Sequence, residues 1–205
     1  MKTKEFVNLE KRLLQDFPGF AIKGSMMFIS PVGHTLRGFC FETSGFDKRA
    51  FYLWSFFMPL YVPSEHIHFT FGERIGGNKR WNADQPELGA ALRSEMLKEL
   101  PFLYSLKTAK DVANALEPMT KRTNPHCHEA FAYTLIRSGK IGAAAEALNR
   151  LLKLIDMTVE WQQKIAERVG LIQGKLLKNP EEALKQLDIW ESETASNLGF
   201  EVLRP

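Results

Sequence analysis

The sequence has few cysteines and no long uninterrupted apolar run. Its two cysteines, Cys40 and Cys127, are far apart among 205 residues. This excludes a disulfide-rich scaffold and favours two free, buried thiols in a reducing compartment. The longest apolar run, residues 50–62, is interrupted by a serine and a proline and falls short of the roughly 20 residues of a membrane helix. Residues 1–17 lack the apolar core of a signal peptide, so we expect a cytoplasmic protein without a membrane partner.

The chain also lacks a strong excess of charge of either sign. Its formal net charge is +3, with 25% charged and 44% hydrophobic residues, which is typical of a soluble globular protein. Nucleic-acid-binding domains usually carry clustered Lys and Arg and a higher isoelectric point. The basic pairs at 79–80 and 121–122 are short and typical of solvated loops. A nucleic-acid partner is therefore not expected.

No catalytic motif of any specificity is present. Residues 72–80 follow an expected strand and contain three glycines, but they match neither a P-loop nor a dinucleotide-binding fingerprint. Cys127 lies between two histidines near an expected helix start, where a thiol pKa is often lowered, although a small buried thiol is the more common reason for such a residue. We therefore predict no catalytic residue and no cofactor.

What the chain has is an aromatic first half. Fifteen of its 23 aromatic residues lie between Phe17 and Trp81. Runs rich in aromatic and branched residues, each closed by turn formers, predict four antiparallel strands, at residues 20–30, 35–43, 50–61 and 66–71. The third is apolar on both faces, which predicts a central position covered on both sides.

Helical signals flank these strands. Phe6, Leu9, Leu13 and Phe17 form an apolar stripe at helical spacing. Further helix starts are predicted from capping patterns and from Asn-Pro pairs, at Asp84 for a helix ending before Pro101, at Thr108, at Asn124 for a helix closed by Gly139, and at Asn179.

The second half contains an approximate repeat of 36 residues. Residues 126–190 resemble tetratricopeptide-type helical hairpins, with Ala132, Leu135, Gly139 and Ala144 at positions where that family carries small, large, glycine and alanine residues. The resemblance implies antiparallel hairpins that pack against the first half. It also predicts a shared buried set, namely Leu135, Ile136, Leu148, Leu151, Leu171, Ile172, Leu184 and Leu187.

The loop Gly72-Glu73-Arg74-Ile75-Gly76, followed by Trp81, is similar to one found in a bacterial domain family of unknown function. This resemblance covers about residues 3–100. It implies a strand-rich shape and no particular activity.

Two His-x-His pairs are the most suggestive groups for ligand binding. Alternate residues on a strand share one face, so His66 and His68 are expected to lie together on the polar face of the fourth strand. With Arg74 and Trp81 they form a candidate ligand-binding surface. His126 and His128 form the second pair, but residues two apart on a helix diverge, and we predict no metal site.

The sequence as a whole predicts an α+β fold, with an antiparallel sheet of about four strands packed with helices and followed by helical hairpins. We expect an α+β domain at 1–105 and a helical region at 106–205. The favoured function is binding of a protein or peptide without catalysis, with Arg137, Arg150 and Trp161 as candidate contacts and Trp190 in the core. The alternative is a ligand-binding domain or enzyme that uses the His66, His68, Arg74 and Trp81 surface.

Overall fold

The chain forms two compact units. The computed structural model describes residues 3–47, 49–77 and 80–203. Unit 1 comprises Met1–Met58, Phe71–Ser105 and Val202–Pro205, and unit 2 comprises Pro59–Thr70 and Leu106–Glu201. Compared with the expected division at 105/106, unit 2 also takes in residues 59–70, and unit 1 also takes in residues 202–205.

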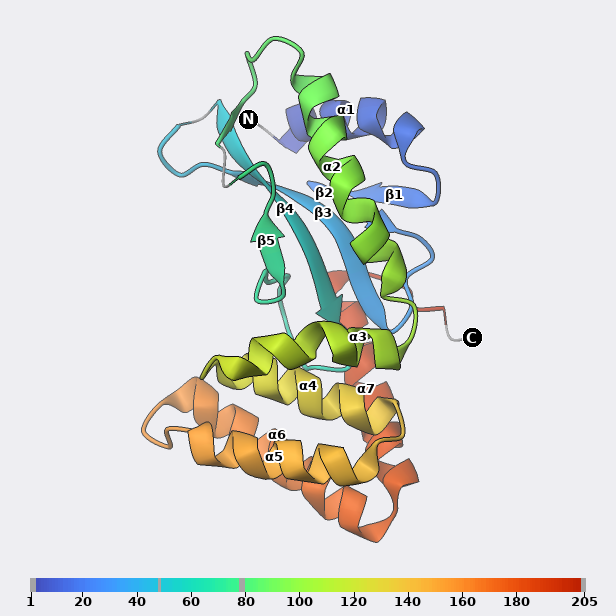
Figure 1. Cartoon of the computed structure of the whole chain (residues 1–205), viewed down its shortest axis with the longest axis vertical. Coiled ribbons are helices and arrows are strands. Elements are labelled where there is room, and N and C mark those ends of the chain that lie inside the picture. Colours follow the sequence, from blue (N-terminus) through green and yellow to red (C-terminus); the bar gives the residue numbers. More distant parts are fainter. Residues whose placement is uncertain (1–2, 48, 78–79, 204–205) are drawn as a thin grey trace. The chain divides into compact units, whose positions relative to one another are not determined.

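Unit 1 is built on an antiparallel sheet (Figure 1). The strands run in the order β1-β2-β3-β4-β5, with β6 also paired to β4. β4 therefore has neighbours on both sides and is central, as predicted. The strand bounds are β1 Phe20–Lys23, β2 Met26–Ile29, β3 Thr35–Thr43, β4 Ala50–Pro59, β5 Gly72–Arg74 and β6 Trp81–Asn82.

Two of the predicted strands are wrong. The strand expected at residues 20–30 is a hairpin in which Phe20 pairs with Ile29. Its turn includes Gly24 with φ of 63°, a conformation that glycine adopts at little cost. The strand expected at residues 66–71 is absent, because residues 66–70 belong to unit 2, where Ile67 and Phe69 are half-buried, while Phe71 belongs to unit 1 and is buried. The next strand, β5, begins only at Gly72.

Two helices, α1 Thr3–Leu13 and α2 Leu88–Ser105, cover one face of the sheet (Figure 1). A short 3-10 helix, η1 Leu14–Asp16, follows α1. The predicted apolar stripe from Phe6 to Phe17 is buried against Phe39, Phe41 and Phe51 of the strands. The core of unit 1 is therefore an aromatic layer between α1, α2 and the sheet.

The bounds of α2 differ from the prediction at both ends. The helix begins at Leu88 rather than after Asp84, because Glu87 has a φ of 55°, which is outside the helical range. It also continues through Pro101 to Ser105. A proline in a helix leaves the carbonyl four residues earlier without its partner. Here that residue is Leu97, which is 39% exposed.

Unit 2 is helical, and its helices pack as the hairpins α4–α5 and α6–α7 (Figure 1). Its elements are α3 Ala109–Leu116, the 3-10 helix η2 Glu117–Lys121, α4 Pro125–Arg137, α5 Ile141–Leu154, α6 Glu160–Lys178 and α7 Pro180–Leu198. The predicted caps at Thr108, Asn124 and Asn179 are all present. None of the helices in the described residues is both long and apolar enough to cross a membrane.

The repeat predicts most of the buried positions in unit 2 and misplaces one. Leu171 is 46% exposed, whereas Leu135, its counterpart at the 36-residue shift, is 4% exposed. Leu184 is half-buried, and the other six members of the set are buried. Trp190 is a core residue as predicted, with its ring 5.5 Å from that of Tyr133. The two hairpins are therefore not equivalent at position 171, and membership of the tetratricopeptide family stays a prediction.

Candidate functional site

Arg74 lies in an aromatic and acidic cluster on unit 1. Its guanidinium carbon is 3.8 Å from the centre of the Tyr52 ring and 4.9 Å from that of Trp54. Its Nη2 donates to Glu42 Oε2 at 3.3 Å, and Trp54 Nε1 donates to the same oxygen at 2.8 Å. The side chains of Arg74 and Glu42 are 35% and 41% exposed. Because Glu42 neutralises the guanidinium, this cluster attracts an anion only weakly.

Trp81 does not lie on a surface. It is 2% exposed and belongs to the core of unit 1. A Cβ at Gly76 would lie 2.7 Å from the Trp81 ring, and Gly76 has a φ of 80°. Glycine is therefore needed beside the tryptophan for both space and backbone geometry. The Arg-Ile-Gly…Trp pattern has a structural reason, and the expected ligand-binding surface lacks one of its four members.

The expected His66 and His68 pair is placed differently from the prediction. The two residues are in unit 2 and not on a strand, so their side chains do not share a strand face. His66 is exposed, while His68 is half-buried. Burial, with a smaller contribution from the nearby His126, lowers the pKa of His68 to about 4. His68 is therefore neutral at pH 7 and cannot act there as a general acid.

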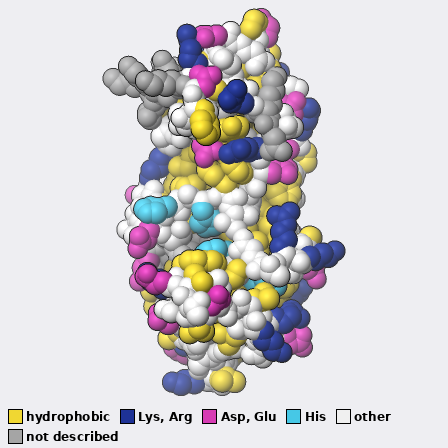
Figure 2. Space-filling view, turned by 90° about the vertical axis from the view of Figure 1, so that its left-hand side faces the viewer, with side chains coloured by type: hydrophobic (Ala, Val, Ile, Leu, Met, Phe, Trp, Pro, Cys, Tyr) yellow, Lys and Arg dark blue, Asp and Glu magenta, His cyan; other side chains and the backbone are white. Residues whose placement is uncertain are grey.

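The structure instead brings His68 near a second histidine, His126. His126 on α4 stacks on Trp161 of α6, with ring centres 4.9 Å apart and an interplanar angle of 14°. Burial also lowers the pKa of His126. Figure 2 shows histidine side chains gathered on one face of the molecule. Among the described residues, no three His, Cys, Asp or Glu side chains come together as metal ligands would. The group offers a neutral aromatic surface.

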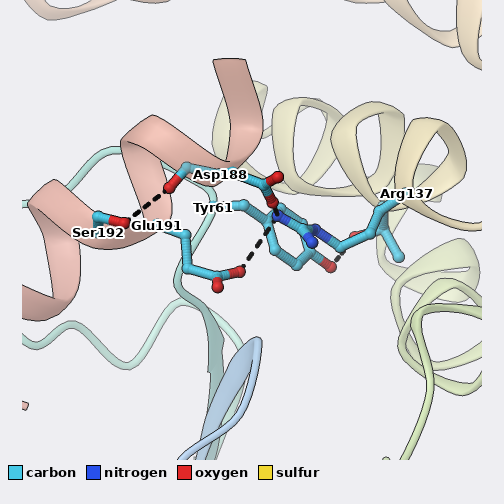
Figure 3. Close-up of polar contacts among 6 residues, drawn as sticks. Tyr61, Arg137, Asp188, Glu191 and Ser192 are labelled. Carbon is cyan, nitrogen blue, oxygen red and sulfur yellow. Dashed lines mark hydrogen bonds and ion pairs between the residues drawn. The ribbon is translucent and has the colours of Figure 1, made fainter. Parts of the chain in front are cut away.

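Arg137 is buried in an ion-pair network rather than exposed for a partner (Figure 3). Its side chain is 9% exposed, and its Nη2 lies 2.8 Å from Asp188 Oδ1 and 3.2 Å from Glu191 Oε2. The guanidinium also lies over the Tyr61 ring, 4.9 Å from its centre. The expectation that Arg137 faces solvent is wrong, because the acidic groups that bind it are on α7, which packs against α4.

Tyr61 extends this network within unit 2. Its hydroxyl and Thr134 Oγ1 are 2.7 Å apart, and both groups are buried. Burial raises the pKa of Tyr61 well above 10, which keeps the phenol neutral. The network therefore joins residues 59–70 to α4 and α7, and its role is structural.

The other two candidate contacts are on the surface of unit 2. Arg150 on α5 is exposed, and Trp161 is 44% exposed. Further large apolar side chains are exposed on this unit, namely Leu152, Met157, Leu171, Leu177 and Ile189. A groove of about 440 Å³ lies between α5 and α6.

One buried acid, Glu10, was missed in the sequence analysis. Glu10 is 0% exposed, and within the part of the chain that the structure describes neither of its carboxyl oxygens has a hydrogen-bond partner. Burial raises its pKa to about 8. Its position gave a signal, since Glu10 is four residues after Phe6 and three before Leu13 on the apolar stripe of α1.

The buried pair Glu129–Arg168 was also missed. Arg168 Nε and Nη2 donate to the two Glu129 oxygens at 2.7 Å and 3.0 Å, and Glu129 is 0% exposed. The pair joins α4 to α6, which are far apart in the sequence. No local sequence pattern connects the two residues.

Both cysteines are free and buried. Burial raises the pKa of Cys40 to about 12 and also raises the pKa of Cys127, against the opposing effect of Arg122. The thiolate is the reactive form, so a disulfide reagent such as Ellman's is expected to modify neither thiol quickly at pH 7.5 and to titrate both in denaturant. A rapid reaction of either thiol in the folded protein would contradict this prediction.

Comparison of the chain with protein-family models, with curated proteins and with solved structures gives no match. The fold described above is that of an α+β protein with a helical-hairpin unit. The two family resemblances stay predictions.

Proposed function

We propose that the protein is a cytoplasmic protein- or peptide-interaction module without catalytic activity. The contact surface is the outer surface of α5 and α6 in unit 2. The observation that carries this proposal is the set of large apolar side chains exposed there, which includes Trp161 at 44% and Leu177 at 89% exposure. Large exposed apolar patches mark surfaces that bind other proteins.

The chemistry of this surface supports binding rather than catalysis. Trp and Arg are frequent anchors at protein interfaces, and the surface carries Trp161 on α6 and Arg150 on α5. Its histidine neighbour, His126, has a lowered pKa and is neutral at pH 7. The alternative, a ligand-binding or catalytic surface of His66, His68, Arg74 and Trp81, would require a side chain that is in the core.

The proposal predicts that substitutions at two surface residues weaken partner binding while the protein stays folded. Trp161→Ala and Arg150→Glu remove interface-type side chains that are not in the core. We expect each variant to recover at least about fivefold less of a specific partner in quantitative affinity capture from cells that naturally express the protein. The melting temperature of Arg150→Glu should change by less than about 3 °C, and that of Trp161→Ala should fall by more because the stack on His126 is lost.

A charge-matched control is Lys107→Glu, at an exposed position of the same unit outside α5 and α6. This variant should recover the partner as well as the unaltered protein does. Equal recovery by all three variants, or no partner above the background of an unrelated protein, would refute an interaction surface on α5 and α6.

A further inference from the structure

The groove between α5 and α6 has apolar walls. Ile141 and Ala145 of α5 line one wall, and Leu176 and Leu177 of α6 line the other. Its volume of about 440 Å³ is within the range of roughly 300–1,000 Å³ typical of ligand pockets. This space is enough for one large apolar side chain and the chain segment that carries it.

The groove also contains a donor and an acceptor that are not paired in the described part of the chain. Gln173 Nε2 donates to Asn149 Oδ1 at 2.9 Å, and both residues line the groove. This leaves the amide N–H groups of Asn149 and the amide oxygen of Gln173 available. One donor beside one acceptor matches the C=O and N–H of a peptide backbone, which are free in an extended segment and used internally in a helix.

The charges around the groove are mainly positive. The charged residues of α5, of the residue before it, of the C-terminal half of α6 and of the first turn of α7 comprise five cations and three anions. The cations are Lys140, Arg150, Lys153, Lys175 and Lys178, and the anions are Glu146, Glu181 and Glu182, of which Glu182 lies near Lys175 and Lys178. Lys140 directly precedes the groove residue Ile141, and Lys178 directly follows Leu177. A cationic border attracts an acidic partner and repels a basic one.

We propose that this groove binds an acidic peptide segment in extended form, with one large apolar side chain held between α5 and α6. The apolar walls take the anchor side chain, Asn149 and Gln173 pair with the backbone amide beside it, and the flanking lysines attract the acidic residues. This inference rests on the proposed function and specifies the kind of partner.

The test uses the full-length protein and a random peptide library displayed on phage. Peptides are selected on the unaltered protein after removal of those that bind Ala145→Arg, in which the new side chain fills the groove. Ala143→Arg is the matched control, because Ala143 is exposed on the same helix and does not line the groove. A selected peptide is then synthesised, and its affinity is measured by fluorescence polarisation.

We expect selected peptides to carry acidic residues on both sides of a Leu, Ile, Met or Phe. Their affinity should fall at least about tenfold in Ala145→Arg and less than about twofold in Ala143→Arg. It should also fall in Lys153→Glu and with increasing salt. Replacement of the apolar anchor by alanine in the peptide should abolish binding.

Several outcomes would overturn the inference. These are an absence of enriched peptides, enrichment of basic or uncharged peptides, or equal affinity of the two arginine variants. Binding of anionic lipid vesicles that is lost in Ala145→Arg would assign the groove to a membrane surface instead. If partner capture depends on Trp161 and Arg150 but not on Ala145, the proposed interaction function is supported and the proposed binding of a peptide in the groove is refuted.

Discussion

Replacing Arg137 by glutamate is expected to lower the free energy of unfolding of unit 2 by about 3–5 kcal/mol. The guanidinium lies between Asp188 and Glu191, and the Glu191 side chain is only 1% exposed. The substitution removes the cation that pairs with Asp188 and Glu191 and places a third carboxylate beside these two. A buried charge that loses its partner is strongly destabilising, because its desolvation is no longer compensated.

The matched control is Arg150→Glu, the same charge change at an exposed residue of the adjacent helix. This variant should alter stability by less than about 0.5 kcal/mol. Hydrogen exchange followed by mass spectrometry, read on peptides from α4 and α7, reports the stability of unit 2 separately from that of unit 1. Equal protection of α4 from hydrogen exchange in the two variants would show that the ion-pair network contributes little to the stability of unit 2.

Local patterns predicted the elements of this fold well where one residue decides the geometry. The caps at Thr108, Asn124 and Asn179 were found because a side-chain oxygen must accept from a helix N–H group. The two-faced apolar strand 50–61 was recognised as central because both of its faces must be covered. The prediction was wrong where the packing partner of a segment decides its structure, as for the strand expected at residues 66–71, of which residues 66–70 belong to the helical unit.

The candidate site was harder to predict from the sequence than the secondary structure, because the neighbours of a side chain depend on tertiary packing. Arg137 looked like a surface residue, since nothing local shows that Asp188 and Glu191 on another helix surround it. His126 and Trp161 are 35 positions apart in the sequence and stack only because α4 and α6 pack together. The α5–α6 groove is likewise a property of two helix surfaces and has no sequence motif.

The stability of unit 1 is expected to fall as the pH rises from about 4.5 to about 8, because of Glu10. Burial raises the pKa of this carboxyl from 4.5 to about 8 in the folded protein. In that pH interval the unfolded chain releases the proton while the folded chain keeps it, so deprotonation favours unfolding. At about 1.4 kcal/mol per pH unit, the loss attributable to Glu10 reaches roughly 5 kcal/mol at most by pH 8 and stays constant above it.

Glu10→Gln tests this, because it retains the shape of the side chain and removes its titration. Hydrogen exchange of β3 and β4, corrected for the intrinsic effect of pH, should show the variant more stable than the unaltered protein at pH 8 and similar to it at pH 4.5. The charge-matched control is Glu87→Gln, at an exposed position of the same unit, which should retain the fall in stability between pH 4.5 and pH 8. Glu10→Leu should be at least as stable as Glu10→Gln at pH 8, since α1 presents this position to an apolar core. A pH profile that Glu10→Gln does not flatten would show that the carboxylate is compensated in the folded protein and that its burial has little effect on the stability of unit 1.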